Sequence, residues 1–520
     1  MKLYTIAAGL LAGSMLLSAC TANFDDINTN PDGMTQVTPA LLATNAIMGI
    51  VRPNSNKSFI QHMLTTKHMA WYELLEESTQ YNNFGRDGFG IYPTLRNYTA
   101  MEELAVETYQ DQKIVSAYKG LALFLKAYRL FNLTISVGDI PYENILMGAE
   151  GPEYLTVPYN TQKDVFRFLL RDLDQAHQYF VEADGASFAG DPVLDGNSAH
   201  WDRVCNTFEL RVLSMLSMKE DDPDLNVKAK YAEVAGRDLL RSNDDNLQLE
   251  FSSKEGQLYP FNETLQSYKQ YAMVSTTVVD VLKEYEDYRL FYYARPSDKR
   301  TEEGISADSW DAYVGTDPSD PFENIMAKAN SRDFSILNDR YTDAGNPAGE
   351  PFITIGYAEL CFNLAEAALR GWIQGDPSEY YKAGIEASMR FAADNTPDNA
   401  NYHHNRQITD EVIAATLDNP KIQLTKDFDH DLYKIMEQKY LAGFMQIPYL
   451  TYYDYRRTGC PEFPINPESN RNVFAPDKIP MRWMYPQDEY DYNKANIEEA
   501  VQRQFGGSDD INQLMWIVKE

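Results

Sequence analysis

Positive charge and cysteine are both scarce in this sequence of 520 residues. It has 46 Lys and Arg against 77 Asp and Glu, which gives a formal net charge of −31. So acidic a surface repels phosphate and anionic lipid, which argues against nucleic acid as a partner and against membrane binding through a basic face. Cys205, Cys361 and Cys460 stand alone, with no C-x-x-C pair. The sequence therefore predicts neither a disulfide framework nor a zinc ribbon.

Motifs of common catalytic sites are also missing. The sequence contains no H-E-x-x-H, no G-x-S-x-G and no P-loop. The segment from Asp26 imitates the start of an EF-hand loop, but Val37 stands where the last ligand should be a glutamate. We therefore expect no enzymatic activity and no cofactor. A structural calcium ion, which the sequence does not place, is left open.

The first 20 residues have the pattern of a lipoprotein signal. A lysine at position 2 precedes an apolar run from Ile6, and Leu17-Ser18-Ala19-Cys20 matches a lipobox. The run is too short to span a bilayer, which takes about 20 apolar residues. We predict that residues 1–19 are removed, that Cys20 is lipidated and that residues 20–520 form one domain. An ordinary signal peptide is the alternative, and no window after Cys20 is expected to approach a transmembrane helix in length and composition.

Apolar residues recur at helical spacing through much of the chain. One stripe runs from Ile114 to Tyr128, and Gly120 within it is small enough for a second helix to approach closely. Thr161, three residues before Asp164, predicts the N-cap of another helix.

A further helical stripe runs from Tyr357 to Trp372 and buries Cys361. Gly375 is expected to stop this helix, and Asp376 is expected to cap the next one, with proline in its first turn. Two antiparallel helices joined by a tight turn are the unit of helical repeats, although no strict 34-residue period is present. We therefore predict a mainly α fold with tetratricopeptide-like helix pairs and little β structure.

Three long polar segments interrupt the helical pattern. They are Tyr81–Tyr98, residues 294–352 and Cys460–Tyr492, and they are rich in Asn, Asp, Gly, Pro and aromatic residues. Loops of this length in a compact domain are usually functional. They predict a large loop-rich half that binds a ligand.

Five groups of short motifs follow the lipobox in order along nearly the whole chain. They are Phe24–Pro31; Leu133-Thr134 with Gly138–Tyr142; Tyr357–Glu359 with Leu364–Ala368; Ile435–Tyr440 with Tyr453–Gly459; and Ile479-Pro480 with Tyr485-Pro486 and Glu489-Tyr490. In these motifs the chain resembles the SusD/RagB family of nutrient-binding outer-membrane lipoproteins. The resemblance implies four tetratricopeptide-like helix pairs packed beneath a loop-rich half.

The same resemblance implies a function. The protein would sit on the outer face of the outer membrane, held by the lipid on Cys20, and capture an oligosaccharide for a SusC-like TonB-dependent transporter. Capture of a peptide, as in a RagB-like protein, is one alternative. A surface glycan hydrolase is a second, less favoured alternative.

Aromatic rings in polar, glycine-rich segments are the candidate ligand contacts. Rings cover the apolar faces of sugars, while amides and charged groups bond the hydroxyl rim. Because nothing in such a segment obliges a ring to be buried, these side chains are expected to be exposed, and they favour a glycan over a peptide. The candidates are Tyr81, Asn82, Asn83, Phe84, Arg86, Phe89 and Tyr92, with Trp310 and Tyr313 as a second wall.

Replacing the predicted lipidation site should release the protein from the membrane. We expect Cys20→Ala to give a folded protein in the aqueous fraction, because acyl chains, at roughly 0.8 kcal/mol per buried methylene, are the expected anchor. Membrane fractionation of the variant checks this. A variant that still resists carbonate and high-salt washes would contradict the assignment of the N-terminus.

Overall fold

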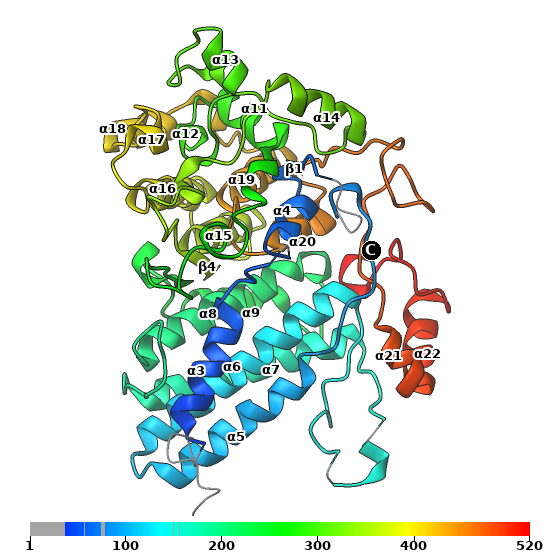
Figure 1. The fold of residues 1–520 in the computed structure, drawn as a ribbon. Helices are drawn as coiled ribbons and strands as arrows, with labels where there is room; N and C mark the ends of the chain where they lie inside the picture. Colours follow the sequence, from blue (N-terminus) through cyan, green and yellow to red (C-terminus); the bar gives the residue numbers. More distant parts are fainter. Residues whose placement is uncertain (1–36, 57, 74–78, 149, 155, 520) are drawn as a thin grey trace, which may run out of the picture.

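Helices make up most of the molecule in the computed structural model, which describes residues 37–519 apart from 57, 74–78, 149 and 155 (Figure 1). The prediction of a mainly α fold is confirmed. The predicted signal sequence, Cys20, the first family motif and most of the EF-hand-like segment lie outside the described residues.

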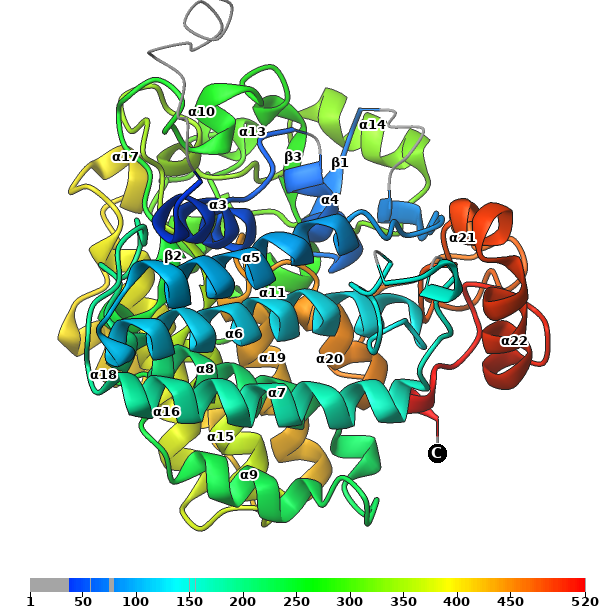
Figure 2. The ribbon, with the colours of Figure 1, turned by 90° about the horizontal axis from the view of Figure 1, so that it is seen from below.

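Long helices pack side by side in the lower part of Figure 1, and Figure 2 shows several of them from below in successive rows. They are α3 (Pro39–Val51), α5 (Tyr92–Thr108), α6 (Gln112–Val137), α7 (Gln162–Ala183), α8 (Ser198–Met215) and α9 (Val227–Ala235).

Further helices, most of them short, and irregular segments form the upper part, while the last two helices of the chain lie beside the lower helices (Figure 1). They are α4 (Ser58–Thr65), α10 (Pro260–Glu263), α11 (Thr276–Glu284), α12 (Leu290–Tyr293), α13 (Asp298–Glu302), α14 (Phe322–Ser331), α15 (Tyr357–Leu369), α16 (Pro377–Asp394), α17 (Ala400–His403), α18 (Asp410–Leu417), α19 (Phe428–Ala442), α20 (Leu450–Thr458), α21 (Gln487–Tyr492) and α22 (Lys494–Phe505).

The described β structure consists of two small antiparallel pairs. Strand β1 (Met69–Trp71) pairs with β3 (Ala272–Val274), and β2 (Leu247–Leu249) pairs with β4 (Phe352–Ile355). The prediction of little β structure agrees with this arrangement.

Helices α6 and α7 form one antiparallel pair. Thr161 caps α7 as predicted, since its hydroxyl accepts from the backbone N–H of Asp164. The Gln162 amide donates to Thr134 O in the last turn of α6 (2.9 Å), which places the start of α7 at the end of α6. Gly120 lets the helices approach closely, because a Cβ there would lie 2.9 Å from the Phe180 ring.

Helices α15 and α16 form a second pair with the same device, since a Cβ on Gly384 would lie 2.8 Å from the Phe362 ring. Asp376 caps α16 as predicted. The expected stop at Gly375 is wrong, because α15 already ends at Leu369 and Gly371 turns the chain with a φ of +72°.

Helix α6 corrects the expectation that no later segment resembles a membrane span. It is long and apolar enough to cross a membrane by length and composition alone. However, 72% of its most apolar window is buried inside the protein, so we assign it to the core. Its apolar character comes from contact with helices on several sides.

The three predicted loops are only partly irregular. The first ends early, because α5 begins at Tyr92 with proline in its first turn. The second contains α13 and α14, which the polar composition concealed. The third is irregular until α21 begins at Gln487, close to the expectation.

Buried charges join three of the helices. Arg457 of α20 donates to both carboxylate oxygens of Glu366 in α15 (2.5 and 2.6 Å) and also contacts Asp454 (2.6 Å). Lys439 of α19 contacts the other Asp454 oxygen at 2.8 Å. Arg457 is thus paired bidentately with Glu366. The neighbouring Arg456 donates to the backbone oxygens of Ile135 and Met481 rather than to a carboxylate.

Removing the charge of Glu366 should destabilise the protein. Burial alone would raise its pKa, but Arg457 and the other nearby cations lower that pKa to about 2. We expect Glu366→Gln to reduce the free energy of unfolding by about 3–5 kcal/mol at neutral pH, because Arg457 loses a buried partner. The contribution should be complete above the ordinary pKa near 4.5 and should fade as the pH falls toward 2.

Urea unfolding of both proteins at several pH values measures the difference. Glu386→Gln is the matched control, since Glu386 pairs with Arg390 on the surface of α16 with about two-fifths of its side chain exposed. Its effect should stay below about 1 kcal/mol. Equal effects of the two substitutions would contradict the role given to the buried pair.

Candidate ligand-binding cavity

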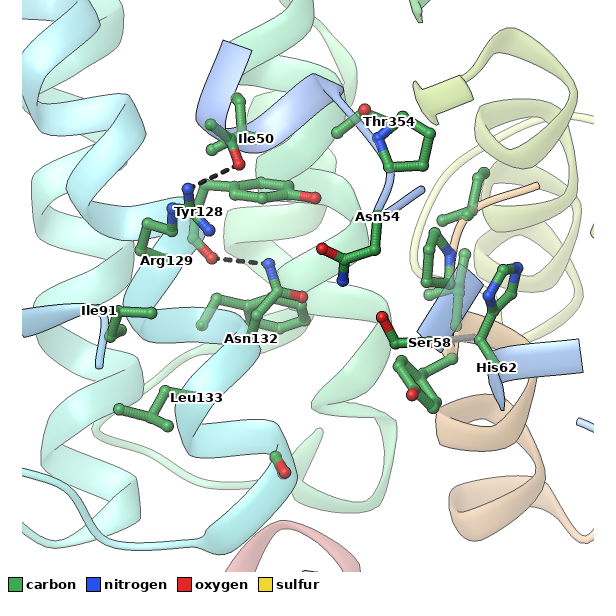
Figure 3. Close-up of a pocket in the computed structure, with 18 of the residues that line it drawn as sticks. Ile50, Asn54, Ser58, His62, Ile91, Tyr128, Arg129, Asn132, Leu133 and Thr354 are labelled. Carbon is green, nitrogen blue, oxygen red and sulfur yellow. Dashed lines mark hydrogen bonds between the residues drawn. The ribbon is translucent and has the colours of Figure 1, made fainter. Parts of the chain in front are cut away.

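A cavity of about 500 Å³ lies between the long helices and the loop-rich half. Figure 3 shows Tyr128 and Asn132 of α6 on one side and Asn54, Ser58 and His62 on the other. Its volume falls within the range of about 300–1,000 Å³ that is usual for small-molecule sites.

The wall from α6 combines a ring with an amide. The Tyr128 hydroxyl points across the cavity (Figure 3). Asn132 donates its amide to Tyr128 O at 2.9 Å, which leaves the amide oxygen to accept from a ligand. Tyr128 packs against Phe124 and Phe208, so its ring is held from behind.

The opposite wall comes from α4 and the segment before it. His62 is 2% exposed, and its Nε2 has no hydrogen-bond partner among the described residues. Burial, with a smaller contribution from His68, lowers the pKa of His62 to about 3. The imidazole is therefore uncharged at neutral pH, and its Nε2 can donate or accept one hydrogen bond with a ligand, depending on the tautomer.

Buried polar groups also line the inner end of the cavity. Thr354 of β4 is 3% exposed, and its hydroxyl has no partner within the described part of the chain. Arg211 of α8 donates to Thr354 O (2.9 Å) and to both carboxylate oxygens of Glu359 (2.6 and 2.5 Å). Glu359 therefore neutralises the charge of Arg211, while the Thr354 hydroxyl remains available to a ligand.

The segment before α20 forms an aromatic wall in an unusual backbone conformation. Met445, Ile447 and Tyr449 have positive φ angles of 62°, 41° and 63°. A β-branched residue in this region is a genuine outlier, and such strain concentrates at ligand sites. The conformation presents Ile447 and Tyr449 to the cavity beside Tyr453.

Trp483 completes this wall and contacts one of the predicted residues, Phe84. Its ring lies edge-on to Tyr449 at 5.5 Å between centroids. On another side it stacks with Phe84 at 4.5 Å, with an angle of 20° between the planes. Phe84 thus supports a lining ring without lining the cavity itself.

The exposure expected of several predicted contacts is wrong. Tyr81, Phe84 and Tyr313 are only 9%, 5% and 0% exposed. The Tyr81 hydroxyl donates to Asp320 O (3.0 Å), and Tyr313 packs edge-on against Phe291. These polar segments fold over apolar helices, so their rings enter the core even though their neighbours in sequence are hydrophilic.

The three predicted polar residues also lie in different surroundings. Asn82 is buried and accepts from the Lys67 ammonium (2.8 Å), while Asn83 is exposed. Arg86 pairs with Asp509 at 3.0 Å. None of these three lines the cavity described above.

The remaining predicted rings lie in two separate places. Phe89 and Tyr92 are partly buried and contact each other, with the Tyr92 hydroxyl on Pro141 O (2.7 Å). Trp310 lines a different cavity of about 320 Å³ beside Tyr288 and Arg406. The two predicted walls therefore do not face one cavity, and ligand contact by these residues stays a prediction.

The predicted segment does reach the cavity, but through residues that were not singled out. Asp87, Gly88 and Ile91 line it. On α6, the signal in the sequence was Asn132 one turn after Tyr128 in an otherwise apolar helix, although Tyr128 was assigned to the core stripe. Among the residues described, no group of three His, Cys, Asp or Glu is placed to hold a metal ion, and the calcium question stays open.

The described residues thus combine a helical scaffold with a lined cavity between its two halves. Comparison with family models identifies the family: residues 31–486 match the SusD-like model described as "Starch-binding associating with outer membrane". The chain belongs to this SusD-like family. No curated protein matches it.

Solved structures agree with this assignment. A SusD homolog from Bacteroides fragilis is 49% identical, with a TM-score of 0.88, and the match covers 93% of this chain and all of that one. A second SusD homolog from the same species is 32% identical over the same shares, with a TM-score of 0.81. A chitin-binding protein at 22% identity and a TM-score of 0.70 has the same fold over 93% of this chain and all of its own.

The burial of Tyr313 leads to a test of the rings that the sequence suggested. We expect Tyr313→Ala to reduce the free energy of unfolding by about 3–5 kcal/mol, since a fully buried ring would leave a cavity. Tyr492→Ala is the control, because Tyr492 is 80% exposed, and it should change stability by less than about 0.5 kcal/mol. Chemical unfolding measures both, and an unchanged stability of Tyr313→Ala would contradict its place in the core.

Proposed function

We propose that this protein captures an oligosaccharide in the 500 Å³ cavity and delivers it to a SusC-like TonB-dependent transporter. The observation that carries the proposal is the lining itself. Rings from Tyr128, Tyr449 and Trp483 alternate with hydrogen-bonding groups whose partners are not provided by the described residues.

The chemistry of the lining suits a sugar. An aromatic face covers the C–H face of a pyranose, and hydroxyl and amide groups meet its equatorial hydroxyls. Thr354 and the uncharged His62 supply buried hydrogen-bonding groups, which reject a ligand that leaves them unpaired. Membership of a family described as starch-binding supports the same reading.

Two other functions are compatible with parts of the molecule. A peptide would use the same rings, and the expected RagB-like alternative is distinguished by the ligand alone. A hydrolase would need two carboxylates across the cleft, whereas Asp87 is the one acidic side chain among the described lining residues. The lining therefore favours binding without cleavage.

The proposed location follows from the family and the sequence together. The family associates with the outer membrane. We place the protein on the exterior face, held by lipid at Cys20, where a captured ligand is presented to the transporter.

Binding to a glycan and peptide array tests the proposed ligand class. The protein without its first 20 residues should bind glycans and release no new reducing ends. Peptide binding alone would support the alternative, and new reducing ends would indicate a hydrolase. For the ligand found, Tyr128→Phe should weaken binding by about 0.5–1.5 kcal/mol in isothermal titration, the value of one hydrogen bond. Tyr492→Phe, which removes an exposed hydroxyl elsewhere, should leave the affinity unchanged.

The proposed partner is tested in mild detergent. Pull-down of the lipidated protein should recover a transporter-sized membrane protein in near-equal amount, since a lid-like contact would bury well over about 2,000 Å². Recovery of the lipoprotein alone in several detergents would count against this partner and would leave ligand binding untouched.

A further inference from the structure

Two arginines line the cavity without a carboxylate partner in the described part of the chain. Arg52 follows the end of α3 and is exposed, and Arg129 lies on α6 beside Tyr128. The protein has a net charge of −31, and many of its arginines pair with carboxylates, Arg237 and Arg457 among them. Two cavity arginines without such a partner in the described part of the chain are therefore candidates for contact with a ligand.

Each of these arginines keeps hydrogen-bond donors free for a ligand. A guanidinium has five N–H donors. Arg129 donates to Gly49 O (2.7 Å) and to the Tyr98 hydroxyl (3.4 Å), and Arg52 makes one long bond to Gly256 O (3.4 Å). Gly49 lies one helical turn before Arg52, so both side chains gather at the C-terminal end of α3.

The other charges at the cavity cancel this pair only in part. Asp87 is the one acidic side chain among the described lining residues, and its carboxylate already accepts from Ser136 Oγ (2.5 Å) and from Gly88 N–H (2.7 Å). Arg211 is neutralised by Glu359, and His62 is uncharged at neutral pH. Asp87 offsets one of the two arginines, so the described lining keeps about one unit of positive charge on a strongly negative protein.

We propose that the cavity selects an acidic oligosaccharide and that Arg52 and Arg129 hold its carboxylate or sulfate group. The planar guanidinium matches the geometry of such oxyanions and can bind them through two parallel hydrogen bonds. The negative surface would repel an anionic ligand elsewhere, so a local positive site is what makes its capture favourable. This inference rests on the proposed capture of an oligosaccharide.

Pairs of glycans that differ only in charge test the inference. The panel contains oligogalacturonides and oligoalginates beside their methyl esters, and sulfated galactan oligosaccharides beside their desulfated forms. We expect the charged member of at least one pair to bind about tenfold more tightly than its neutral partner, and the preferred pair separates carboxylate from sulfate. Equal or tighter binding of the neutral members would overturn the inference and leave oligosaccharide capture standing. Binding of no member of this panel would also overturn the inference, whereas oligosaccharide capture falls only if the glycan array likewise shows no binding.

A variant of the exposed arginine locates the effect. Arg52→Gln should lower the affinity for the charged glycan about tenfold and leave the affinity for its neutral partner unchanged. Arg96→Gln is the matched control, because it removes the same charge from an exposed position on the neighbouring helix α5 that does not line the cavity. Equal losses of affinity in the two variants would show a general electrostatic effect of the removed charge rather than contact between Arg52 and the glycan. This result would overturn the proposed site. Thermal melts of both variants confirm that each remains folded.

Discussion

The buried guanidinium of Arg457 constrains the arrangement of the helices around it. It lies between Glu366 of α15 and Asp454 of α20, and Lys439 of α19 shares the second carboxylate. Buried ions are tolerated only when each meets its partner, so these contacts favour one register for the three helices. A second buried pair, between Arg211 and Glu359, extends the constraint from α15 to α8 and ends at the inner wall of the cavity.

The same region sets the width of the cavity. Arg456, next in sequence to the buried guanidinium, binds Ile135 O near the end of α6 (2.6 Å) and Met481 O before Trp483 (2.8 Å). One side chain on α20 therefore fixes the distance to α6 on one side and to the aromatic wall on the other. The ligand-facing groups are held by a rigid scaffold, which lowers the entropic cost of binding.

Local rules account for the parts of the fold that the sequence predicted. The N-caps Thr161 and Asp376 were predictable because each side chain bonds the first turn of the helix that directly follows it. The close approach at Gly120 was predictable because glycine has no Cβ. Local rules do not predict the cavity, because its walls come from α4, α6, β4 and the segment before α20, which are far apart in the sequence. The exposure of the rings in the polar segment from Tyr81 was wrongly predicted for the same reason. Whether a ring is exposed depends on the helix that the segment crosses, and the local composition does not contain that information.

The left-handed residues before α20 have a consequence for how this protein can change over time. Each such residue costs of order 1–3 kcal/mol, which the surrounding packing must offset. Glycine at Ile447 would relieve part of that cost, yet it would remove a side chain from the cavity wall and loosen its backbone. Selection for thermal robustness alone would therefore erode this wall, and its persistence would mark a lineage in which ligand capture outweighs stability.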